Sequence, residues 1–378
     1  MEILRLGKTP WYVKWISDCN MKLLDLYIIK KYISTFTVML VLFIPISVLV
    51  DLSQKIDKFK QHELSTTEIL SHYYDFVWVF GYQLFPIFLF LSVIWFTSKL
   101  ASNSEVIAVL SSGISFYRYL RPFIISASII AMLAFGASMF WVPKASKNYN
   151  SFKYEYVSMG RKVMLTENIY KQIGDSDFIY ISNYNANRQV GYNFTWEHFD
   201  DNQLIYKIKA QNIRWVEKDS IHRLSQFFQR TIINDKEVIR KEARIDTLLT
   251  LDLNAMVPVT YKAQTLNFFE LNEYIRQERE NGSPLINSHL LVRHKRWSLP
   301  ISAFILTLIA VAVASFKKRG GMGINLAMGI ILAFIYIFFD KIFEVMVEKS
   351  NFTPWLAAWI PNAIFAVLSI YLLRHAKR

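Results

Sequence analysis

The chain has 378 residues, of which 53% are hydrophobic and 16% aromatic, with a mean hydropathy of +0.22. A soluble domain does not need so much apolar surface, so the composition makes a membrane protein the first class to test. The net charge is +13, and in a membrane protein such an excess indicates loops and lipid headgroup contacts rather than nucleic acid.

The first twenty residues, Met1–Asn20, mix basic residues with tryptophan and tyrosine. They contain no uninterrupted apolar core followed by a small-residue cleavage site, so a secretory signal peptide is not predicted. They are either an interfacial arm or an extension ahead of a start at Met21. We favour the extension, because Met21–Ile28 is already typical of a beginning. With Lys30 and Lys31, residues 1–31 form the N-terminal arm of the predicted organisation.

Six apolar runs are each long enough to cross about 30 Å of hydrocarbon as a helix. They are Tyr32–Val50, Phe76–Ser98, Phe123–Val142, Trp297–Phe316, Met322–Phe339 and Phe352–Leu373. Helices are expected because an unpaired backbone amide in lipid costs several kcal/mol. Three runs precede a polar block and three follow it, which gives two membrane regions, 32–143 and 297–378.

Lysine and arginine residues in the short connections set the orientation. They lie before the first run, between the second and third, between the fourth and fifth, and after the last: Lys30, Lys31, Lys99, Arg118, Arg121, Lys317, Lys318, Arg319, Arg374, Lys377 and Arg378. All of them share one side of the membrane if the N-terminus is cytoplasmic. The sequence therefore predicts that both termini are cytoplasmic and that the polar block lies outside.

The polar block at 144–266 is predicted to form β-strands. Its candidate strands are short, rich in β-branched and aromatic residues, and separated by Asn, Asp and Gly: Phe178–Ile181, Tyr192–Trp196, Leu204–Ile208 and Ile213–Val216. This spacing is typical of a small antiparallel sandwich or open barrel. Because the chain has one cysteine, Cys19, disulfides cannot hold this domain together.

A helical connector is predicted at 267–296. Asn267 can cap a helix with one apolar face, and Gly282 can end it. We expect a second helix to begin at Ser283–Pro284 and to lead into the fourth apolar run.

Catalytic patterns are absent from the sequence. It has no His-Glu-x-x-His, no paired cysteines at zinc spacing, no Gly-x-Ser-x-Gly and no full phosphate loop. A membrane enzyme should place ionisable groups within its spans, and these runs contain almost none. We therefore expect a non-enzymatic protein with no metal site and no cofactor.

The segment at 102–113, between the second and third runs, is a candidate coupling helix. Ser102–Glu105 fits a capping box, Val106–Leu110 is apolar, and Gly113 can end the helix. One interpretation is a short interfacial helix that Glu105 caps. The other is a helix that docks into a groove of a cytoplasmic partner, and the two roles are compatible. The candidate docking residues are Ser104, Glu105, Val106, Val109, Leu110 and Gly113.

Basic residues also gather on the predicted outer side, against the positive-inside tendency. The candidate lipid-binding residues are Lys55, Lys58, Lys60, Lys144, Lys147, Arg296 and Lys341. One interpretation is that they snorkel to ordinary headgroups, with Asp51, Asp57 and Asp340 as local partners. The other is a ring that holds an anionic amphiphile.

Over essentially Met21–Arg378 the chain resembles the LptF/LptG permeases of the lipopolysaccharide exporter. Spans in a three-plus-three arrangement around a β block carry the resemblance, together with four motifs: Leu24–Ile28, Ile56–Lys60, Ser104–Gly113 and Phe339–Phe343. The surroundings of Asp57 and Asp340 are more similar to LptG than to LptF. Gln54 stands where we match a family lysine, so we expect the basic set to be shifted.

The resemblance implies an α-helical polytopic protein of the bacterial inner membrane, with six transmembrane helices and an inserted periplasmic β-jellyroll-like domain. It implies an LptF-like partner permease and an LptB-like ATPase dimer, which alone binds ATP. LptC-like and LptA-like jellyroll proteins would continue a bridge toward the outer membrane. The implied cargo is lipopolysaccharide, taken from the outer leaflet of the inner membrane.

The expected function is therefore that of a transport subunit rather than an enzyme. Two alternatives remain open at this point. A membrane-bound enzyme of glycolipid processing would be favoured by an ionisable pair buried between spans and a closed polar pocket. A sensing or scaffolding membrane protein would use its outer domain to bind a ligand.

Overall fold

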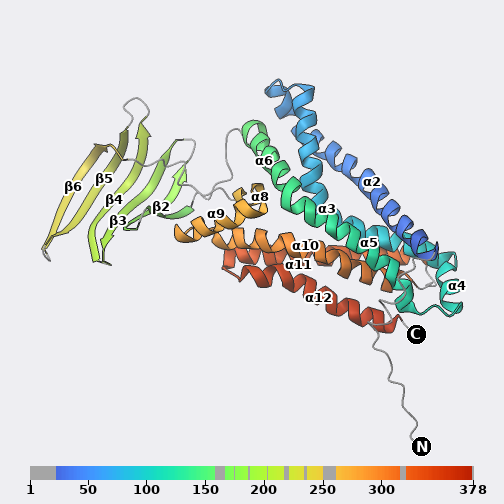
Figure 1. Ribbon diagram of the computed structural model, residues 1–378. Helices are drawn as coiled ribbons and strands as arrows, with labels where there is room; N and C mark the ends of the chain where they lie inside the picture. Colours follow the sequence, from blue (N-terminus) through green and yellow to red (C-terminus); the bar gives the residue numbers. More distant parts are fainter. Residues whose placement is uncertain are drawn as a thin grey trace, which may run out of the picture.

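The computed structural model describes residues 23–157, 167–173, 175–185, 188–201, 203–216, 221–233, 236–249, 261–315 and 321–376. Both interpretations of Met1–Asn20 concern residues outside these ranges. A helical bundle makes up most of the described chain, and an antiparallel sheet lies beyond one of its ends (Figure 1).

Six helices in the described ranges are long and apolar enough to cross a membrane, and each overlaps one predicted run. They are α2 (Leu23–Gln61), α3 (Thr66–Ser102), the continuous helix that begins with α5 (Phe116–Gly136), α10 (Ile286–Ala314), α11 (Gly321–Ser350) and α12 (Pro354–His375). The 39 residues of α2 span about 58 Å at 1.5 Å per residue, more than the hydrocarbon thickness. The prediction of six spans is confirmed, and several helices extend beyond their apolar runs.

The third span is built from several helical segments. After α5 come the π-helical turn η1 (Ala137–Trp141), α6 (Val142–Phe152) and a second π-helical turn, η2 (Lys153–Val157). Pro143 follows η1 almost directly and has no N–H to donate. Because proline disrupts the hydrogen bonds of the preceding turn, it accounts for the wider turn at η1.

The helices differ in how far they are buried. Of the most apolar segment of α10, 67% is buried, against 0% for α2. Small residues let neighbouring helices approach α10 closely, and Ala303, Ala310 and Ala314 have no exposed surface. α10 therefore forms the centre of the bundle, whereas α2 lies at its edge.

Residues 167–247 form a six-stranded antiparallel sheet in the described part of the chain, which confirms the prediction of an inserted β domain. The first residues of the predicted block, 144–157, are helical and belong to α6 and η2. The strands of the sheet are β1 (Glu167–Ile173), β2 (Asp177–Asn185), β3 (Val190–Asp200), β4 (Gln203–Val216), β5 (Ile221–Ile233) and β6 (Lys236–Thr247). Each pairs with the next along the chain, as in a meander (Figure 1). Ile181, Phe194 and Ile213 are among the buried residues on its packed face.

The prediction of two separate strands at Leu204–Ile208 and Ile213–Val216 is wrong, because both segments belong to β4. Ala210 lies between them, is buried, and pairs with Phe194 of β3. Backbone pairing with β3 therefore continues through the polar residues between the two segments, while the buried positions change phase between Ala210 and Ile213.

The connector contains α8 (Lys262–Thr265) and α9 (Phe268–Glu280). The predicted cap is confirmed: the Asn267 side chain accepts from the Glu270 N–H, and the Glu270 carboxylate accepts from the Asn267 N–H, both at 2.9 Å. Gly282, with φ of +63°, follows the end of α9. The predicted helix start at Ser283–Pro284 is wrong by two residues, since α10 begins at Ile286. A proline disfavours helical geometry in the residue before it.

Candidate functional site

The two ends of the helical bundle carry different elements (Figure 1). One carries the short helix α4 (Glu105–Ser111) between α3 and α5, and we call it the α4 end. The other lies next to the β domain and the connector, and we call it the sheet end. Candidate residues predicted from the sequence occur at both.

The capping box predicted for Ser102–Glu105 is wrong. Ser102 is the last residue of α3, and its hydroxyl donates to the Lys99 carbonyl oxygen at 2.9 Å. Ser104 precedes α4 with φ of +63°, and its side chain makes no capping hydrogen bond. Because α3 continues through the first serine, only two residues remain for the turn, too few for the box geometry. Gly113, with φ of +86°, lies just past the end of α4 as predicted.

α4 packs one side against the bundle and exposes the other. Val106 is 1% exposed, and Val109 and Leu110 pack half-buried against the same core. Ile107 is 51% exposed and Ser111 is also exposed. The predicted apolar docking residues therefore hold α4 in place, and Ile107 and Ser111 form its outward face.

Glu105 is bonded within the chain. Its Oε2 accepts from the Tyr27 hydroxyl at 3.1 Å, and its Oε1 accepts from the Asn103 side-chain amide at 3.2 Å. Two residues before Tyr27, Asp25 accepts two hydrogen bonds from the Arg118 guanidinium, at 2.7 and 2.6 Å. Our sequence reasoning assigned no role to Asp25 or Tyr27. The one available signal was an aspartate at the start of an apolar helix, where an ionisable group needs a partner.

A cluster of four charged residues joins α10 to α11 at the sheet end. Lys295 Nζ lies 2.9 Å from Asp340 Oδ2 and 2.7 Å from Glu344 Oε2. Lys341 Nζ lies 3.0 Å from Glu344. Asp340 was expected as a local partner for the outer cations, and its observed partner is Lys295 of another helix. Neighbouring residues of a helix, such as Asp340 and Lys341, do not face each other.

This cluster lines a cavity of about 270 Å³ between α3, α6, α10 and α11. Leu84, Pro86 and Leu299 contribute apolar surface. The polar surface includes the charged cluster and Arg296, which is 5% exposed. Its Nη2 donates to the carbonyl oxygens of Leu266 (2.5 Å) and Ala263 (3.3 Å), and its Nη1 has no hydrogen-bond partner among the described residues. The cavity is therefore amphipathic, and it is lined by a buried arginine with hydrogen-bond donors that the described residues do not use.

The structure brings two of the seven predicted lipid-binding residues, Arg296 and Lys341, to this cavity. Lys55 is paired instead with Asp51 at 2.7 Å and lies 5.7 Å from the centre of the Tyr149 ring. Lys58 Nζ donates to the Val157 carbonyl oxygen at 2.5 Å. The remaining residues are exposed on α2 and α6: Lys60, Lys144 and Lys147. The seven residues therefore do not form one ring.

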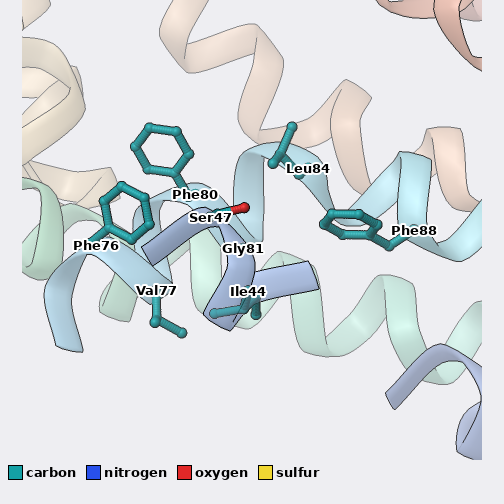
Figure 2. A pocket seen from close by; sticks show the side chains of 8 residues that line it. All are labelled: Ile44, Ser47, Phe76, Val77, Phe80, Gly81, Leu84 and Phe88. Carbon is teal, nitrogen blue, oxygen red and sulfur yellow. The ribbon is translucent and has the colours of Figure 1, made fainter. Parts of the chain in front are cut away.

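A second hollow, between α2 and α3, is too small to be a site. Figure 2 shows it lined by Ile44, Ser47 and aromatic residues of α3, next to Gly81. Its volume is about 10 Å³, roughly the space of one water molecule. The Ser47 hydroxyl already donates to the Phe43 carbonyl oxygen at 3.0 Å. This hollow is a packing crevice.

The free edge of the sheet is charged. β6 forms the last strand among the described residues, and along it Lys, Arg, Glu and Asp predominate. Arg223 of β5 bonds to Asp246 at 2.8 Å and, with Arg244, lowers the pKa of that carboxyl to about 2. Charged side chains on an edge strand oppose indiscriminate pairing with other chains. The opposite edge strand, β1, is joined to the connector where the Gln172 N–H donates to the Asn281 carbonyl oxygen at 3.3 Å.

Six membrane-length helices around an inserted antiparallel sheet define a multi-pass membrane protein with a β domain. The sequence model of the lipopolysaccharide export system permeases LptF/LptG matches residues 26–375. The chain belongs to this family. It is also similar to the lipopolysaccharide export system permease protein LptG of Escherichia coli strain K12 and of Escherichia coli O6:H1. Each is 20% identical over 292 residues, which cover 76% of this chain and 80% of the relative.

Proposed function

We propose that this chain is the LptG-like permease subunit of an ABC-type lipopolysaccharide exporter in the bacterial inner membrane. It takes lipopolysaccharide from the outer leaflet and passes it to a bridge of periplasmic β-jellyroll domains. The observation that carries the proposal is the amphipathic cavity of about 270 Å³ between membrane-length helices at the sheet end, in a member of this family.

The cavity has the chemistry to receive part of a phosphorylated lipid. Its apolar surface suits acyl chains. Nη1 of Arg296, which has no partner among the residues that the structure describes, offers donors to a phosphate oxygen. Lys341 stands at the same cavity and is half exposed. The exposed Lys60, Lys144 and Lys147 extend the basic surface on α2 and α6, while Lys55 and Lys58 position these helices.

ATP is hydrolysed by a separate LptB-like dimer that docks at the α4 end. The docking segment spans Ser104 to Gly113, and the exposed Ile107 and Ser111 contact the ATPase directly. Val106, Val109 and Leu110 hold α4 against the bundle, so a rigid-body displacement of α4 reaches the membrane helices.

The other partners follow from the two remaining surfaces. An LptF-like permease covers the lipid-exposed side that includes α2, whose apolar segment is not buried within this chain. The 144–266 region, placed in the periplasm with both termini cytoplasmic, offers an open strand edge to LptC-like or LptA-like jellyroll proteins. The charges of β6 select a partner with complementary charges.

A glycolipid-processing enzyme is the second candidate function, and the Lys295–Asp340–Glu344 cluster favours it. These ionisable groups lie between two spans and beside a polar cavity. However, Lys295 is held by two carboxylates, which leaves it no free electron pair to act as a base. The two functions differ in one observable: an enzyme would alter a glycolipid without an ATPase, whereas the transporter would leave its cargo chemically unchanged.

The experiment is purification of the full chain from its own membranes, followed by identification of the proteins that remain bound. We expect a stoichiometric ATPase with a phosphate loop. Glu105→Arg should abolish its retention while membrane insertion stays intact, because the reversed charge repels a complementary basic groove and opposes the helix dipole. Glu105→Gln is the control, since its amide oxygen still accepts from Tyr27 without the charge. Full retention of the ATPase by Glu105→Arg would contradict the docking role.

A further inference from the structure

The edge helix α2 contacts distant segments at both of its ends. At its C-terminal end, Phe59 is 2% exposed and packs against aromatic residues of α3. None of its most apolar segment is buried. Near the α4 end, however, Tyr32 is fully buried, and its hydroxyl lies 2.6 Å from Thr307 Oγ1 of α10. Asp25 and Tyr27 add the contacts to Arg118 and Glu105 described above. α2 is therefore anchored at both ends and loosely packed along the apolar segment between them.

The Asp25–Arg118 pair is built as a stiff connection. Both carboxylate oxygens accept from the two guanidinium nitrogens, and the Asp25 side chain is only 4% exposed. A two-pronged pair of this kind fixes orientation as well as distance. Because the aspartate is buried, its charge cannot be left without a partner at low cost. A movement of Arg118 therefore carries Asp25 with it.

Both anchors lead back to α4. Glu105 is the first residue of α4, so any displacement of α4 moves the carboxylate that Tyr27 contacts. Arg118 lies in the first turn of α5, which follows α4 after four residues. α2 thus receives the movement of α4 through a direct hydrogen bond and through the start of α5.

We infer that Asp25, Tyr27 and Arg118 are positioning residues that transmit displacement of α4 to α2. We call the Tyr27–Glu105 and Asp25–Arg118 contacts the α2 latch. This inference rests on the proposed function, in which an ATPase docks on α4. It assigns Glu105 a second role inside the chain, and it makes α2 the helix that moves, because shifting its unburied segment disrupts little core packing.

A merely structural role for these contacts makes a different prediction. If they only stabilise the fold, removing the Tyr27 hydroxyl should lower stability slightly and leave transport coupling unchanged. If they transmit movement, the assembled complex should hydrolyse ATP yet deliver less lipid per ATP. The ratio of lipid delivered to ATP hydrolysed therefore separates the two roles.

The test uses the full exporter complex in proteoliposomes loaded with lipopolysaccharide. Tyr27→Phe removes the donor to Glu105, and Tyr74→Phe, on an exposed tyrosine of α3, is the matched control. Arg118→Gln alone leaves a buried aspartate charge, so the second variant is the double Asp25→Asn/Arg118→Gln, which removes both charges together. For each variant we measure the amount of ATPase retained, the unfolding midpoint, the ATP hydrolysed and the lipid delivered.

We expect ATPase retention and the unfolding midpoint to be unchanged in Tyr27→Phe. The lipid delivered per ATP should fall about threefold, the factor that corresponds to the free energy of one hydrogen bond. In the double variant we expect a fall of about tenfold, and in Tyr74→Phe none. A wild-type ratio in Tyr27→Phe would overturn the α2 latch, and so would loss of the ATPase from that variant. If the wild-type chain itself retains no ATPase, the proposed function fails first, which is a distinct result.

Discussion

The α4 end and the sheet end of the bundle each join two helices through ion pairs, and they use this chemistry differently. At the α4 end, the Asp25 carboxylate is only 4% exposed, and the Arg118 guanidinium that donates to it is 25% exposed. At the sheet end, Lys295, Asp340 and Glu344 are each 21–28% exposed, and Lys341 48%, beside the cavity.

The difference shows that surroundings, rather than the number of charges, determine what a charged cluster can do. A two-pronged pair on a buried carboxylate has one arrangement, and it holds two helices in a fixed relation. A cluster with two cations and two carboxylates beside a cavity has several possible arrangements, and an anionic ligand can change them.

Arg118→Gln should be the most destabilising substitution, by about 3–5 kcal/mol, because it removes both guanidinium hydrogen bonds from the buried Asp25 carboxylate. The measurement is the unfolding midpoint of the detergent-solubilised chain. Asp25→Asn/Arg118→Gln should recover much of the loss, since neither charge remains. Equal loss in the single and double variants would mean that packing, rather than the ion pair, holds the α4 end together.

Lys295→Gln should destabilise by less, about 1–3 kcal/mol, because Glu344 keeps Lys341 as a partner and the cavity lets water reach Asp340. Lys341→Gln should cost below about 1 kcal/mol, as expected for an exposed pair. Both are measured by the same unfolding midpoint. A loss for Lys295→Gln as large as that for Arg118→Gln would contradict the view that the sheet end is adaptable.

Gly329→Ala tests whether the position of α11 determines the geometry of the cluster that it carries. A Cβ at Gly329 would lie 2.3 Å from Cδ1 of the buried Ile94 on α3. We expect a cost of about 1–2 kcal/mol from this overpacking. Ile94→Val removes that Cδ1. The loss of unfolding free energy in the double variant should therefore be smaller than the sum of the losses in the two single variants. If the two losses of stability are strictly additive, the side chains at the two positions are not in contact.

The effect is small for each residue at the lysines that make no ion pair in the described part of the chain. Replacing Lys60, Lys144 and Lys147 together by glutamine should reduce lipopolysaccharide retained by the purified complex about tenfold, which equals about 1.4 kcal/mol. Lys55→Gln, at a lysine paired with Asp51, is the matched control and should leave retention unchanged. If retention by the triple variant is unchanged at both low and high salt, these lysines only snorkel to headgroups.

Local signals in the sequence were sufficient for much of the fold. A membrane span depends on the composition of one continuous segment, so all six runs were predictable. The Asn267 cap and the glycines at 113 and 282 act within one turn of a helix, and they were predictable for the same reason. The capping box at Ser102–Glu105 failed because its pattern says nothing about where the preceding helix ends.

Charged and polar residues concealed strands whose structure depends on pairing with a neighbouring strand. β6 carries alternating charges of both signs and was not predicted as a strand, yet it pairs along its length with β5. Polar residues between Leu204–Ile208 and Ile213–Val216 suggested a break in a continuous strand. In each case a neighbouring strand supplies backbone partners that the segment alone does not reveal.

The sequence by itself determined the class of the protein: six spans, an inserted β domain and a family resemblance that the comparisons confirm. Only the tertiary structure decided which charges meet. Asp25 and Arg118 are 93 residues apart, and Lys295 and Asp340 are 45 apart. Hydropathy fixes that a segment enters the membrane, but its rotation about its own axis is fixed by packing against its neighbours. That rotation sets whether a lysine faces a carboxylate, a cavity or lipid.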